Sequence, residues 1–155
     1  MKPDKTLEIR LRTNTGGLTP ESKRHLLIDT ASFPAQPGAY VVRYATLLVP
    51  RMEGESGVLK IGKADKGIKA RFENYNHMKP VTTGDENLLE LLDRTKRQPT
   101  NVRLMHFLSR NQGKQMVIDC YFSTNAANPR EREKQLLREY FNRHQELPPL
   151  NFGLR

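Results

Sequence analysis

The feature that most constrains this chain is a pair of short apolar runs followed by an amphipathic segment, all within residues 38–75. The first run begins at Gly38-Ala39-Tyr40, and the second ends at Lys60-Ile61-Gly62. Short apolar runs bounded by glycine, proline and charged residues are typical of β-strands. The sequence therefore predicts two strands, over residues 39–48 and 58–61, joined by a loop over residues 49–57.

Alternation along these two strands predicts which side chains share a face of the sheet. In the first strand, Tyr40, Val42 and Tyr44 are predicted to lie on one face. In the second strand, Val58 and Lys60 are predicted to lie on one face, and Leu59 and Ile61 on the other. An antiparallel pairing can bring Tyr40 and Lys60 to one face, with a register that the sequence leaves open.

Two predicted helices carry a charged residue on an apolar face. Over residues 66–77, Ile68, Arg71 and Tyr75 follow the three-then-four spacing of one helix face. Over residues 130–143, Glu133 lies at about the centre of the apolar face, because Leu136, Leu137 and Tyr140 fall within about 60° of it at about 100° per residue. An inward charge must be neutralised, paired or bound to metal, so both residues are candidates for a functional site.

The remaining segments complete one predicted α/β (α+β) domain with a small central antiparallel sheet flanked by helices. They are a strand over residues 7–12, helices over 19–28 and 85–98, and strands over 101–108 and 115–123 that join as a hairpin through Asn111-Gln112-Gly113. We divide the chain into an N-terminal extension, residues 1–33 with a strand and a helix, and a main domain, residues 34–155. The extension is either an extra sheet edge or a substrate-gripping arm.

The charge balance limits the partners of the protein. The chain has 26 Lys and Arg against 17 Asp and Glu, a net charge of +9. Such an excess favours a polyanion as partner, although a merely basic surface would give the same balance. The single Cys120 lies in an apolar run and is expected to be a buried structural thiol. No apolar run has the length of a membrane span and the first residues lack a signal-peptide core, so a cytoplasmic location is expected.

At these positions the sequence resembles the GIY-YIG nuclease superfamily, in its restriction-enzyme-like or phage-type members. Gly38-Ala39-Tyr40 resembles the first signature, with Ala for Ile, and Lys60-Ile61-Gly62 resembles the second, with Lys for Tyr. The family's arginine and its supporting tyrosine are matched by Arg71 and Tyr75, its metal-binding glutamate by Glu133, and its closing Leu-Asn by Leu150-Asn151. The gap between the two signatures is longer than is usual in the family, which suggests an extra recognition flap.

The resemblance implies a GIY-YIG-like fold. It also implies an endonuclease that hydrolyses double-stranded DNA with the help of one Mg²⁺ or Mn²⁺ ion. Glu133 would bind the metal, and Arg71 would hold the scissile phosphate. Tyr40 would be the hydrogen-bond partner of the water or its general base, the latter provided that positive charge lowers its pKa. Lys60 and Lys63 would position water or phosphate, Tyr75 would support Arg71, and Asn151 would bridge the end of the last helix to the site. Among the histidines, His77 alone lies near enough to the arginine helix for a site role.

Two other functions remain open at this point. The protein could be a nucleic-acid-binding module of the same fold without cleavage, in which Glu133 forms a buried salt bridge with Arg71. It could also be a ribosome-associated basic protein with no active site. A symmetric DNA target would require a dimer, and the sequence identifies no interface for one.

Overall fold

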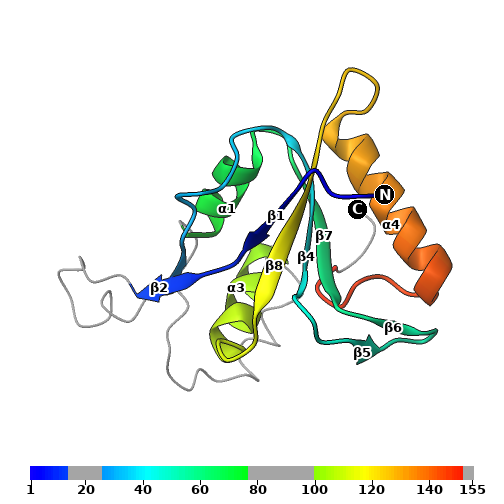
Figure 1. The fold of residues 1–155 in the computed structure, drawn as a ribbon, viewed down its shortest axis with the longest axis horizontal. Helices are drawn as coiled ribbons and strands as arrows, with labels where there is room; N and C mark the ends of the chain where they lie inside the picture. The colour runs from blue at the N-terminus through cyan, green and yellow to red at the C-terminus, as the bar shows by residue number, and fades with distance from the viewer. Residues whose placement is uncertain (14–25, 77–99, 152–155) are drawn as a thin grey trace.

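The computed structural model describes residues 1–13, 26–76 and 100–151 of the chain. Its centre is a four-stranded antiparallel sheet with the order β1 (Lys5–Glu8), β8 (Met116–Phe122), β4 (Gly38–Tyr44) and β7 (Val58–Ala64) (Figure 1). The protein is therefore a mixed α+β structure with a central antiparallel sheet and flanking helices, which confirms the fold class at this level.

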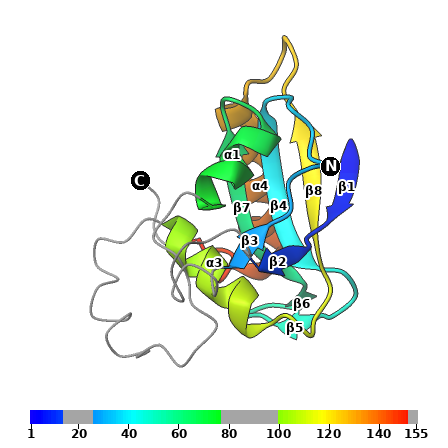
Figure 2. The same cartoon turned by 90° about the vertical axis from the view of Figure 1, so that its left-hand side faces the viewer.

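Helices cover both faces of the sheet (Figures 1 and 2). In the described ranges, α1 (Ile68–Asn76) and α3 (Thr100–Arg110) lie on one face, and α4 (Pro129–His144) lies on the other. The larger core, on the α1 and α3 side, contains Tyr40 and Val42, and the smaller core, beneath α4, contains Ala39 and Val41. The predicted division of β4 into two faces is thus confirmed. None of these helices is long and apolar enough to cross a membrane.

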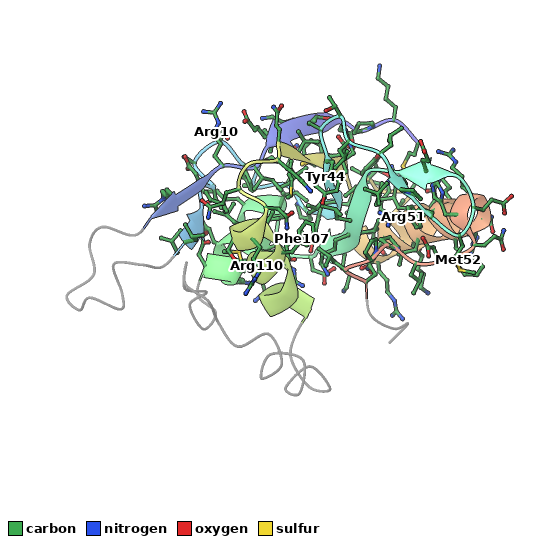
Figure 3. The ribbon with its side chains drawn as sticks, turned by 90° about the horizontal axis from the view of Figure 1, so that it is seen from below. Arg10, Tyr44, Arg51, Met52, Phe107 and Arg110 are labelled. Carbon is green, nitrogen blue, oxygen red and sulfur yellow. The ribbon has the colours of Figure 1, made fainter. Side chains whose placement is uncertain are left out.

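The prediction of a strand over residues 101–108 is wrong, because this segment lies in helix α3. Leu104, Met105 and Leu108 are buried in the core at helical spacing. Phe107 packs against Tyr44 of β4, with ring centroids 6.2 Å apart (Figure 3). A short apolar run is compatible with the two-residue period of a strand and with the 3.6-residue period of a helix. In this protein the helix buries these apolar residues on one face. The hairpin expected between this segment and β8 is therefore absent, whereas β8 itself and α4 are confirmed.

The N-terminal residues are part of the same core. Strand β1 pairs with β8 and forms an edge of the sheet, which decides in favour of a sheet edge for this part of the extension. The segment predicted as one strand over residues 7–12 belongs to two strands. Its first residues lie in β1, whereas β2 (Leu11–Thr13) pairs with β3 (Leu26–Ile28) in a separate two-stranded sheet. The end of the helix predicted over residues 19–28 is therefore a strand. The rest of that helix, the helix over residues 85–98 and His77 lie outside the described residues.

The predicted loop over residues 49–57 contains a small hairpin of β5 (Val49–Pro50) and β6 (Glu55–Ser56). Its tip lies against the end of α4, since His144 Nδ1 is 2.8 Å from the carbonyl oxygen of Glu53. Figure 3 shows Arg51 and Met52 of this hairpin at the same end of the molecule as α4.

A bulge changes the expected faces of β7. Val42 pairs with Lys60 and Arg43 pairs with Val58, so that Leu59 is an extra residue opposite neither. Leu59 consequently packs in the larger core, whereas Val58 and Ile61 pack in the smaller one. The expectations that Val58 shares a face with Lys60 and that Leu59 shares a face with Ile61 are both wrong for this reason. Tyr40 and Lys60 nevertheless lie on one face, as predicted.

A buried acid ties three strands of the sheet together. Asp119 of β8 accepts hydrogen bonds from Arg43 Nε of β4 at 2.6 Å and from Thr6 Oγ1 of β1 at 2.6 Å. The carboxylate in turn raises the pKa of Arg43. Removing one partner would leave a buried polar group unpaired, so this contact fixes the register of β1, β8 and β4.

The burial of Cys120 predicts an inert thiol. The residue is fully buried, and burial together with the Asp119 charge raises the pKa of the thiol to about 12. Because the thiolate is the reacting form, the native protein should not react with an aromatic disulfide reagent over minutes, and the protein in concentrated urea should release one equivalent of the coloured thiolate. Rapid reaction of the native protein would contradict the described packing of β8.

Candidate functional site

The centre of the candidate site is a pair of buried tyrosines. Tyr40 Oη of β4 and Tyr75 Oη of α1 are 2.6 Å apart, and each ring packs against Phe72, at centroid distances of 4.9 and 5.1 Å. Both tyrosines are essentially inaccessible to solvent. Their hydroxyls therefore hold each other in place inside the larger core.

Arg71 completes this tyrosine pair. It lies one helical turn before Tyr75, and its guanidinium carbon is 5.5 Å from the centroid of the Tyr75 ring. The guanidinium is close enough to Tyr40 and Tyr75 to lower the pKa of both hydroxyls through its charge and side-chain hydrogen bonding. Arg71 is only half-buried, so two buried phenols hold a cation that still reaches the surface.

Burial has the larger effect on both tyrosines. It raises the pKa of Tyr40 above its usual value, despite the opposing charge of Arg71, and raises that of Tyr75 further. The protein's own groups thus do not provide the lowered pKa that a general base at Tyr40 would require. At neutral pH both side chains are protonated hydrogen-bonding groups.

Lys60 is a buried lysine on the same face of the sheet as Tyr40. It is 3% exposed, and burial, followed by the charge of Arg71, lowers its pKa to about 8, with Glu133 opposing the shift. Within the three described ranges its ammonium has neither a hydrogen bond nor an ion pair. Burial thus brings the pKa of this lysine closer to neutrality than that of a lysine in water.

Glu133 reaches the cluster from α4, on the other side of the sheet. It is half-buried, and burial raises its pKa, whereas the charges of Lys63, Lys60 and Arg71 lower it. Its carboxylate has no hydrogen bond or ion pair to any residue that the structure describes. The salt bridge from Glu133 to Arg71, which was the alternative for a protein without cleavage, is therefore not formed, and the carboxylate is available to a ligand.

Strand β7 lies at the edge of the sheet, and there residues from the two faces meet. Lys63 points to the α4 face and donates to Asp65 Oδ2 at 2.5 Å. The Asp65 charge acts on Glu133 and raises its pKa, which makes Asp65 a member of the site that the sequence analysis missed. No pattern marks this residue, because an aspartate in a turn after a strand is common.

Asn151 anchors the chain after α4 to this edge. Its side chain accepts from Ile61 N at 2.8 Å and donates to Ile61 O at 2.7 Å, and Leu150 N donates to Leu59 O at 2.9 Å. These contacts occupy backbone groups of β7 on the side where no described residue forms a strand. Asn151 thus supports the backbone of β7 between Lys60 and Gly62.

Tyr40, Lys60, Arg71 and Glu133 form one electrostatic cluster, because the charge of each changes the pKa of at least one other. Tyr75 joins it through the hydrogen bond to Tyr40, Lys63 through its effect on Glu133, and Asn151 lies beside it on β7. In the part of the chain described, no group of three or more His, Cys, Asp and Glu could hold a metal ion. Glu133 could still hold Mg²⁺ as a single protein ligand, since this ion often keeps several waters and takes only one or two carboxylates. Its accessible, unpaired carboxylate fits that requirement.

Comparisons of this chain with models of known protein families, with curated proteins and with solved structures found no match. The function is therefore inferred from the chemistry and geometry of the site itself.

The position of Tyr40 depends on the absence of a side chain at residue 62. Tyr40 pairs with Gly62 on the neighbouring strand, and a Cβ atom there would overlap the Tyr40 hydroxyl and its ring. We expect Gly62→Ala to displace the ring and to lower the free energy of unfolding by about 1–3 kcal/mol, as overpacking of a core does. Urea unfolding followed by circular dichroism measures this change.

Gly113→Ala is the matched control, because a Cβ atom at Gly113 would meet nothing within 4 Å. Equal stability of both variants and the wild type would show that Tyr40 does not occupy the space above Gly62.

Proposed function

We propose that this protein is a metal-dependent endonuclease that hydrolyses DNA phosphodiester bonds, with a GIY-YIG-like fold. The proposal is carried by one observation: an arginine held by two buried phenols lies beside a buried lysine and an unpaired carboxylate. Phosphodiester hydrolysis requires positioned positive charge on the phosphate and a means of activating water, which these groups would supply.

Arg71 would bind the scissile phosphate and stabilise the negative charge that develops on it. Its planar guanidinium is suited to two phosphate oxygens, and Tyr40 and Tyr75 would restrict its orientation. Because an arginine fixed before the reaction loses little conformational freedom on binding, the paired phenols would contribute to catalysis by positioning.

Glu133 would hold a single Mg²⁺ or Mn²⁺ ion, together with water and phosphate oxygens. When bound, such an ion polarises the phosphate and lowers the pKa of a coordinated water. Tyr40 is protonated at neutral pH and inaccessible to solvent, so it would help to hold Arg71 rather than deprotonate the water. Lys60, with its pKa of about 8, is better suited to exchange a proton near neutrality.

The net charge of +9 also agrees with a DNA-binding protein of the same fold that does not cleave. The two functions differ in what a nuclease assay shows. Cleavage that depends on metal and on Glu133 would support the nuclease. Binding that is weakened by salt, without cleavage of any DNA tested, would support the non-cleaving DNA-binding protein.

The test replaces Glu133 with glutamine and follows the conversion of supercoiled plasmid with Mg²⁺ or with EDTA. We expect the wild type to nick or linearise plasmid with Mg²⁺ only, and Glu133→Gln to be slower by on the order of 100-fold, the scale on which loss of one positioned group affects catalysis. The variant should keep or increase its stability, because burial disfavours the charged carboxylate at neutral pH and glutamine carries no charge.

Glu139→Gln on the same helix is the matched control. This carboxylate is exposed, pairs with the amino terminus at 3.4 Å and accepts a hydrogen bond from Gln135 Nε2 at 3.4 Å. Both contacts lie on the surface, so their loss should leave cleavage unchanged. Equal cleavage by the wild type and Glu133→Gln would remove the proposed role of Glu133 in metal binding.

A further inference from the structure

Helix α4 carries three basic residues on one exposed stripe. Arg130, Lys134 and Arg138 are four residues apart and lie on one side of the helix. All three are exposed, and none has an ion pair or a hydrogen bond to another residue in the described part of the chain. The stripe, defined by these three residues, is therefore an array of positive charge that the protein itself does not neutralise.

The stripe begins beside Glu133. With Glu133 at zero and about 100° per residue, Arg130 lies at about 60°, Lys134 at about 100° and Arg138 at about 140°. The sheet-facing Leu136 and Tyr140 lie on the other side of zero, at about −60° and −20°. Arg130 and Lys134 are thus neighbours of the candidate metal ligand, and the stripe turns toward solvent as it approaches Arg138.

The acidic residues of α4 do not cancel this charge. Glu131 accepts from the backbone amide of Asn128 at 2.8 Å in the capping box, and Glu139 pairs with the amino terminus. The remaining acid is Glu133, which belongs to the site. The outward charge of the helix next to the site is therefore positive.

We propose that Arg130, Lys134 and Arg138 form the phosphate-contacting track for the DNA strand that enters the site. This inference rests on the proposed function, and it names the surface that positions the substrate. Four residues of helix rise about 6 Å, so successive cations of the stripe have a spacing suited to successive phosphates of a strand. Such contacts fix the register of a nucleic acid without reading its sequence.

An anionic membrane is a poorer partner for the same charges. A helix that binds a membrane surface inserts an apolar face next to its basic face. The apolar face of α4, with Leu136 and Tyr140, is buried against the sheet and cannot insert without unfolding the core. Phe141 of the same helix is 47% exposed beside the stripe, but a single ring is not the apolar face that membrane insertion requires.

The position of each residue predicts an order of effects. Arg130 and Lys134, which lie nearest Glu133, should contribute most to binding, and Arg138, which turns farthest from the site, should contribute least. Single replacements by glutamine, a residue that favours helices, test this order without removing the helix.

The decisive experiment measures the binding of a fluorescent 20-base-pair DNA duplex in EDTA at several salt concentrations. Each lost phosphate contact should reduce the slope of log affinity against log salt by about 0.9, so Arg130→Gln/Lys134→Gln/Arg138→Gln should reduce it by about 2 to 3. The charge-conserving variant Arg130→Lys/Lys134→Arg/Arg138→Lys should restore the slope.

The control removes the same number of charges from the β1 and β2 edge, in Lys2→Gln/Lys5→Gln/Arg12→Gln, where all three residues are exposed. We expect a change in slope below about 1 for this variant. Equal changes in the two triple variants, or an unchanged slope in the stripe variant, would overturn the proposal. Because the assay involves no cleavage, its result is independent of whether the protein proves to be a nuclease.

Discussion

The packing of the Tyr40 ring over Gly62 is the constraint on which the site depends. Antiparallel pairing places these two residues opposite each other, and only a residue without a side chain leaves room for the phenol. The ring then reaches Tyr75 on α1, and the pair of hydroxyls fixes the environment of Arg71. One contact between neighbouring strands thus orders three side chains from two different elements.

The sheet edge explains how residues from opposite faces can act together. Helices α1 and α4 cover different faces of the sheet, but residues 1–13, 26–76 and 100–151 form no strand beyond β7. The charges of Arg71 from one side and Glu133 from the other therefore both act on Lys60, and Asn151 holds the backbone of β7 there. Burial disfavours the charged forms of Lys60 and Glu133, so these two residues lower the stability of the fold. Ionisable groups with pKa values shifted in this way are common at functional sites.

The local signals in the sequence were sufficient for most of the site. Alternation predicted the faces of β4, and helical spacing predicted that Glu133 and Arg71 would be turned inward. What the sequence could not provide depends on contacts between distant segments. The bulge at Leu59 appears only in the pairing with β4, and Leu26–Ile28 is a strand because β2 lies beside it. The apolar residues of α3 are compatible with a strand or a helix in the sequence, and only their packing in the core determines that they form a helix. The Asn151 contact and the place of Asp65 near Glu133 likewise follow from the folded chain.

The most direct test of the account is the position of a bound Mn²⁺ ion in crystals of the protein, measured by anomalous scattering. The account predicts a peak within coordination distance of the Glu133 carboxylate, on the side that faces Lys60 and Arg71, and no such peak in crystals of Glu133→Gln. An ion bound elsewhere, with none at Glu133, would contradict the single-metal site at the edge of β7.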